Sequence, residues 1–72
     1  MKIVLVKKGK YVIKIKNLVK ARIFYRPDFF EGLDVPYNND WNIEMFGMSK
    51  EFDTMKECID SFNEYNEMYK II

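Results

Sequence analysis

The sequence predicts an α+β domain in which an antiparallel sheet of three to four strands carries one C-terminal α-helix packed on one face. Two patterns support this prediction. The N-terminal part alternates apolar and other residues with the period of two typical of strands, and the C-terminal part repeats its apolar residues with the period of a helix. No repeat, low-complexity tract or Ser/Gly/Pro-rich linker interrupts the chain, so we expect residues 1–72 to form a single small domain.

A first hairpin is expected to pair residues 2–7 with residues 10–16. Gly9 lies in the turn between them, where glycine adopts a positive φ at little cost. The register of this hairpin stays open, because a turn longer by one residue moves every side chain of the first strand to the opposite face of the sheet. One register places Val4 and Val6 on the core face, and the other places Ile3 and Leu5 there.

A second hairpin is expected to pair residues 10–16 with residues 20–26, both of which alternate. If residues 17–19 connect the two strands, apolar residues oppose each other on the core face. Those pairs are Ile15 with Ala21, Ile13 with Ile23 and Tyr11 with Tyr25. The other face then opposes Lys16 to Lys20, Lys14 to Arg22, Val12 to Phe24 and Lys10 to Arg26. Like charges at this spacing destabilise a hairpin, and a bound polyanion would relieve the repulsion.

The middle of the chain changes pattern. Residues 27–40 are expected to form a long loop that opens with one helical turn closed by Gly32. Residues 41–46 are expected to form a fourth strand, and Gly47 marks a turn or bulge before residues 48–52.

The clearest element is a C-terminal helix over residues 55–69. Thr54 and Glu57 form a capping box at its start. Its apolar stripe consists of Met55, Cys58, Ile59, Phe62, Tyr65 and Tyr69. The remaining surface is acidic and carries Glu57, Asp60, Glu64 and Glu67.

The distribution of charge is uneven, although the net charge is only +1. Residues 1–27 hold nine Lys and Arg and no acidic residue, whereas residues 28–72 hold three Lys and all eleven Asp and Glu. The sheet face opposite the helix is therefore expected to be basic, and a basic surface is a candidate footprint for nucleic acid or another polyanion.

The composition argues against catalysis. The chain has no histidine, which is the commonest general base and zinc ligand, and its three glycines are isolated from one another. Asp28, Glu31, Asp34 and Asp40 match no known metal-binding loop, and Cys58 lies on the apolar helix stripe like a small core residue. We expect no enzyme activity, no cofactor and no metal.

The compartment is expected to be cytoplasmic. A single cysteine cannot close an internal disulfide, and the apolar run after Met1 is interrupted by Lys7 and Lys8 before it could serve as a signal or a membrane span.

Two groups of residues are candidates for binding. The first is the basic sheet face, where Phe24 could stack on bases, and its residues are Lys10, Lys14, Lys16, Lys20, Arg22, Phe24 and Arg26. The second is the apolar part of the loop, where Phe29, Phe30 and Tyr37, together with Leu33 and Val35, could hold a protein partner. Two plainer interpretations stay open: the basic face is simply solvated, and Phe29 and Phe30 fold back to seal a small core.

The order of three strands followed by a helix resembles the small DNA-binding domains of the integrase arm-binding and plant AP2 types. That resemblance implies a sheet that enters the major groove, with Lys10, Lys14, Lys16, Lys20, Arg22 and Arg26 as the corresponding cations. The long apolar loop departs from this outline. In its composition, which is rich in Lys, Ile and Asn and includes a single Ala, the chain also resembles small accessory proteins of phages and mobile elements, including anti-CRISPR inhibitors.

The expected function is therefore a non-enzymatic binding protein, encoded by a phage or mobile element, that acts stoichiometrically on a nucleic acid or a nucleic-acid-handling complex. A sheet-type DNA-binding regulator and a structural or dimerisation module are the alternatives. A homodimer is a possible state, because a second chain would bury more surface than so short a chain can bury alone.

Overall fold

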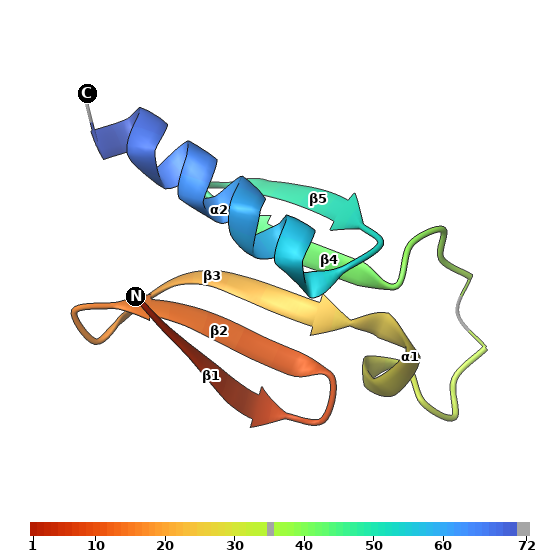
Figure 1. Ribbon diagram of the computed structural model, residues 1–72. Coiled ribbons are helices and arrows are strands. Elements are labelled where there is room, and N and C mark those ends of the chain that lie inside the picture. The colour runs from red at the N-terminus through yellow and green to blue at the C-terminus, as the bar shows by residue number, and fades with distance from the viewer. Residues whose placement is uncertain (35, 71–72) are drawn as a thin grey trace.

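A computed structural model describes residues 1–34 and 36–70 as a single antiparallel sheet with one long helix on one face (Figure 1). The sheet order is β1-β2-β3-β4-β5, so that each strand pairs only with its neighbours in the chain. The elements are β1 (Lys2–Lys7), β2 (Lys10–Ile15), β3 (Leu18–Tyr25), α1 (Arg26–Phe29), β4 (Trp41–Met45), β5 (Met48–Phe52) and α2 (Met55–Lys70).

The α+β class and the C-terminal helix are confirmed, but the expected strand count of three to four is wrong. A fifth strand forms because Phe46 and Gly47 both adopt positive φ, at 49° and 75°. Two consecutive residues in this conformation make a tight hairpin turn whose twist suits the flanking strands. Residues 48–52 therefore return directly alongside β4.

The first hairpin adopts one of the two registers left open. Ile3 lies opposite Ile13, and Leu5 lies opposite Tyr11, which puts both β1 residues on the same side as the core. The register shifts between Leu5 and Lys7, where Val6 is the extra residue.

The expected register of the second hairpin is wrong by two residues from Lys10 to Ile13 and by three residues at Lys14 and Ile15. Ile13 lies opposite Ala21, and Tyr11 lies opposite Ile23. Lys16 and Asn17 both have positive φ, at 53° and 66°, so they close the turn alone and residues 18 and 19 join β3. Because the faces alternate with a period of two, the expected core residues still point inward.

The core lies between α2 and the sheet, where the helix packs mainly against β3, β4 and β5 and β2 contributes Ile13. Its buried residues are Ile13, Ala21, Ile23, Ile43, Met45, Cys58 and Phe62. The expected stripe of α2 supplies Cys58 and Phe62, with Met55, Ile59 and Tyr65 packed at the margin. Tyr69, which was also expected on this stripe, is 45% exposed.

The capping box of α2 is confirmed. The backbone N–H of Glu57 donates to Thr54 Oγ1 at 3.2 Å, and the Thr54 hydroxyl in turn donates to Glu57 Oε1 at 3.0 Å. The helix start is therefore held by its own side chains, as the sequence pattern predicts.

The opposite face of the sheet, hereafter the open face, is partly covered by α1. The Phe29 ring lies 4.9 Å from the Phe24 ring in an edge-to-face arrangement, and Val12 on β2 is only 6% exposed. Gly9 allows this packing, because a Cβ at that position would lie 2.4 Å from the Phe29 backbone nitrogen. The expected helical turn after β3 thus exists and closes one end of the open face.

Candidate nucleic-acid interface

The open face consists of side chains from all five strands in three transverse rows. Strand register puts Lys2, Lys14 and Val19 in the first row. The second row contains Val4, Val12, Arg22, Glu44 and Ser49. The third row contains Lys7, Lys10, Phe24, Asn42 and Glu51. Cations therefore lie on β1, β2 and β3, while the carboxylates lie on β4 and β5.

The cation pairs expected across the second hairpin do not form. Because of the register shift, Lys10 lies opposite Phe24, Arg22 lies opposite Val12, and Lys14 lies opposite Val19. Two other pairs of like charges take their place, since Lys2 lies opposite Lys14 and Lys7 lies opposite Lys10. Like charges so close destabilise the two strands, and a bound anion would reduce that cost.

At the end of the sheet near Gly9, hereafter the Gly9 end, the cations have partners. Lys8 Nζ donates a hydrogen bond to Glu31 Oε2, and this bond raises the pKa of Lys8 above its usual value. Arg26 Nη1 lies 2.7 Å from Glu51 Oε1 and donates to the Asn39 carbonyl at 3.3 Å.

The two remaining lysines of the Gly9 end lie over aromatic rings. Lys7 Nζ is 5.0 Å from the centre of the Phe29 ring, and Lys10 Nζ is 5.8 Å from the centre of the Phe24 ring. Both distances fall within the range of cation–π attraction. Of the cations at this end, Lys10 and Arg26 are sequence-predicted site residues, and both are engaged inside the protein.

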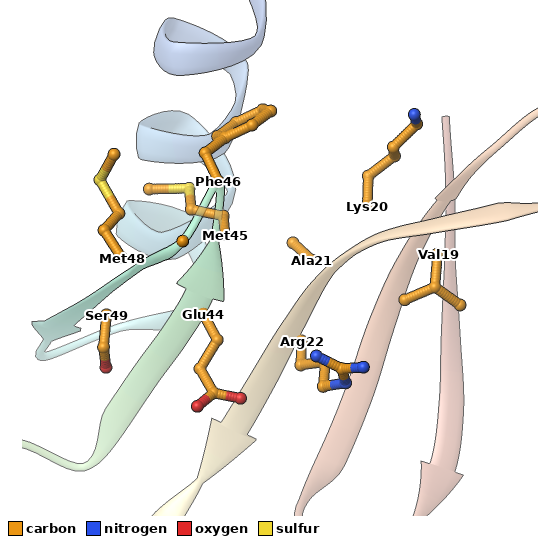
Figure 2. A pocket seen from close by; sticks show the side chains of 10 residues that line it. Val19, Lys20, Ala21, Arg22, Glu44, Met45, Phe46, Met48 and Ser49 are labelled. Carbon is orange, nitrogen blue, oxygen red and sulfur yellow. The ribbon is translucent and has the colours of Figure 1, made fainter.

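At the other end, hereafter the turn end, the cations have no acidic partner among the described residues. Lys2, Lys14 and Lys16 line one shallow depression of about 340 Å³, together with Met1, Val4 and Asn17. Arg22 is exposed one row away on β3, and it forms no ion pair with Glu44, its register partner on β4. Figure 2 shows the Arg22 guanidinium turned away from the Glu44 carboxylate.

Lys20 was predicted to lie on the open face, but in the structure it does not. The register shift between Ile13 and Lys14 inserts an extra residue in β3, so that Lys20 and Ala21 point to the same side. Figure 2 shows Lys20 and Arg22 extending to opposite sides of β3. Lys20 lines a groove with Asn66 of α2, and thus belongs to the helix side of the sheet.

Phe24 is not the exposed stacking platform that the sequence suggested. Its ring is half-buried between the Lys10 side chain and Phe29. Lys2 was not among the site residues predicted from the sequence. Its position beside Lys14 depends on the register of the first hairpin, which the residue pattern leaves open.

The three loop candidates take different positions. Phe29 and Phe30 are half-buried, with ring centres 5.3 Å apart, and together seal the Gly9 end of the open face. Tyr37 is 39% exposed and lies 5.9 Å from the Arg26 guanidinium. Leu33 is 64% exposed, while Val35 lies outside the described residues.

The chemically reactive side chains form no centre in the part of the chain that the structure describes. No three His, Cys, Asp or Glu side chains gather there as a metal site would require. Cys58 is fully buried, and burial, with a smaller effect from the Glu57 carboxylate, raises its pKa to about 11. A thiol with this pKa is protonated at neutral pH and is a poor nucleophile.

Within residues 1–34 and 36–70, neither helix is long and apolar enough to cross a membrane. Comparison of the chain with family models, curated proteins and solved structures found no significant match to any of them.

Proposed function

We propose that this protein is a non-enzymatic binding protein that holds the phosphate backbone of a nucleic acid on the turn end of its open face. The observation that supports the proposal is the gathering of Lys2, Lys14, Lys16 and Arg22 at one end of the sheet without acidic partners among the described residues. Cations already paired within a protein have little left to offer a phosphate, whereas these four are available.

The geometry favours backbone contact over base reading. Phe24 is half-buried, so the open face offers no exposed aromatic ring among its three rows on which a base could stack. Lysine is a flexible point charge, which suits phosphate oxygens better than the fixed donor and acceptor pattern of a base edge. We therefore expect weak sequence preference and strong dependence on salt.

The first experiment is a fluorescence-anisotropy titration against short labelled duplex DNA, single-stranded DNA and RNA. Affinity should fall steeply between about 50 and 200 mM salt, because each phosphate contact releases counterions. If no nucleic acid binds at the lower salt concentration, the proposal is wrong.

Substitutions then locate the interface. Lys14→Gln and Arg22→Gln should each weaken binding and reduce the slope of log affinity against log salt by about one. The matched control is Lys8→Gln, which removes the same charge from an exposed lysine that already has a partner in Glu31. Equal losses from all three substitutions would mean that only net charge matters.

A stoichiometric inhibitor of a nucleic-acid-handling complex, of the anti-CRISPR type and encoded by a mobile element, is a narrower form of the same proposal. It is favoured by Glu44, an exposed carboxylate that has no ion pair among the described residues and shares the open face with the cations. Carboxylates repel a phosphate backbone but suit a basic protein surface, so the whole face fits a complex that presents both. Glu44→Gln should weaken binding to such a complex while leaving or improving binding to free nucleic acid.

A further inference from the structure

The helix side of the sheet is only partly covered. α2 packs against β3, β4 and β5, and Figure 1 shows β1 and β2 extending beyond the helix. Ile3 and Leu5 point to this side, because they lie opposite the core residue Ile13 and its neighbour Tyr11. Ile3 is nevertheless 37% exposed and Leu5 is 59% exposed. The helix side of β1 is therefore an apolar surface that the described residues cover only in part.

β1 is also an edge of the sheet, since it pairs with β2 on one side only. Its outer side presents backbone N–H and C=O groups with no partner strand in the described chain. An exposed edge strand is a template for the addition of another strand, which forms backbone hydrogen bonds and places alternate side chains on the two faces. The bulge at Val6 confines smooth pairing to the part of β1 before it.

The charges around β1 select the kind of strand that can be added. On the open face, Lys2 lies beside Lys14, and both lack acidic partners among the described residues. A second copy of β1 would bring its own Lys2 and Lys7 to this edge, and residues 1–27 contain no acidic residue to offset them. Like charges across strands are destabilising, whereas acidic side chains beside Lys2 would be attracted to it and, at longer range, to Lys14 on the next strand.

We propose that the outer edge of β1 is a docking site for an extended segment of a partner protein that alternates acidic and apolar residues. The apolar residues of the segment would cover Ile3 and Leu5 on the helix side, and its acidic residues would lie beside Lys2 on the open face, with Lys14 one strand further into the sheet. The site differs from the proposed nucleic-acid interface in its use of the β1 backbone and Leu5, and it does not depend on nucleic-acid binding.

The test uses two labelled peptides of the same composition. The first is acetyl-Glu-Val-Glu-Ile-Glu-Val-Glu-amide, and the second groups the same residues as Glu-Glu-Glu-Glu-Val-Ile-Val. At about 200 mM salt, where loose charge attraction is screened, the alternating peptide should bind the full chain at least about tenfold more tightly. Amide chemical shifts of residues 2–7 should move most. Equal affinity for both peptides, or shifts centred away from β1, would overturn the proposal.

A pair of variants checks the apolar half of the site. Leu5→Lys should weaken the alternating peptide by about tenfold. Leu33→Lys makes the same change at a leucine that is 64% exposed in the loop and should leave binding unchanged. Circular dichroism checks that Leu5→Lys is folded. If it is not, Leu5→Thr is used instead, because threonine retains a preference for strands. Unchanged binding in a folded Leu5 variant would contradict the proposal.

Sedimentation of the wild-type protein tests the other candidate occupant of the β1 edge, which is a second copy of the chain. A monomer over the micromolar to millimolar range agrees with the charge argument. A concentration-dependent dimer that Leu5→Lys abolishes would assign the edge to a second copy of the chain and overturn the assignment to an acidic partner.

Discussion

The two ends of the basic open face have similar numbers of cations but very different surroundings. At the Gly9 end, Lys7, Lys8, Lys10 and Arg26 lie against rings or carboxylates of the same chain. At the turn end, the four cations of the proposed interface lie without acidic partners in the described residues. The availability of a cation, rather than its place in a basic stretch of sequence, therefore decides whether it can hold an external anion.

The Gly9 end owes its packing to the contact between Gly9 and α1, so Gly9→Ala should have the largest effect. The methyl group would meet the Phe29 backbone, and φ at Gly9 is +78°. The unfavourable φ alone costs about 1–2 kcal/mol, and the clash should raise the loss of unfolding free energy to about 3 kcal/mol or more. Urea denaturation measures this loss.

Gly32→Ala is the matched control for that variant. Gly32 has nearly the same φ, +79°, but a Cβ there would meet nothing within 4 Å. Its cost should stay near the conformational term of about 1–2 kcal/mol. Equal losses for the two variants would show that the contact between Gly9 and α1 does not hold this end together.

Removing the ring that covers the Gly9 end should have the next largest effect. Phe29→Ala deletes the partner of Phe24 and of Lys7, and for a half-buried ring we expect a loss of about 2 kcal/mol in unfolding free energy. Leu33→Ala, at an exposed position of the same loop, should change stability by less than about 0.5 kcal/mol. A stable Phe29→Ala protein would mean that Phe29 is free to contact a partner.

Releasing one cation at the Gly9 end should make the two ends more alike. Glu51→Gln removes the carboxylate 2.7 Å from Arg26 Nη1, and the freed guanidinium should strengthen nucleic-acid binding by about two- to fivefold at low salt. The anisotropy titration of the proposed interface measures this gain. Weaker binding would indicate instead that the ion pair orients the surface.

The smallest effect is expected from Glu31→Gln. The hydrogen bond from Lys8 to Glu31 raises the pKa of Lys8 above 10.5, so the variant should lower that pKa toward its ordinary value. Since the folded pKa is raised, the benefit of the pair is present below about pH 10.5 and is lost as the pH rises through the folded value. An NMR titration of the Lys8 side chain follows the shift, and an unchanged pKa would show that the pair is not formed in solution.

Local patterns predicted the elements of this fold well. The alternation of Tyr11, Ile13 and Ile15 placed the correct face inward, and the Thr54–Glu57 capping box marked the start of α2. These features depend on residues a few positions apart, where period and hydrogen-bonding chemistry are decisive.

The candidate site was predicted less well, because it depends on register. Asn17 accepts a left-handed backbone, which shortened the second turn and moved the cross-strand partners of β2 by two or three residues. A bulge in β3 also placed Lys20 on the helix side, and the register of the first hairpin placed Lys2 opposite Lys14. Such shifts change which charges meet without changing the hydrophobic alternation, so residue pattern alone could not resolve them.

The meander order of the sheet also has a consequence for how fast the protein folds. Every strand pairs with its neighbour in the chain, and three of the four pairings are closed by turns of about two residues. Chains dominated by contacts close in sequence refold quickly, because little loop entropy is lost before pairing becomes favourable. The exception is the meeting of β3 and β4 across residues 26–40, and this step is where we expect the folding rate to be set.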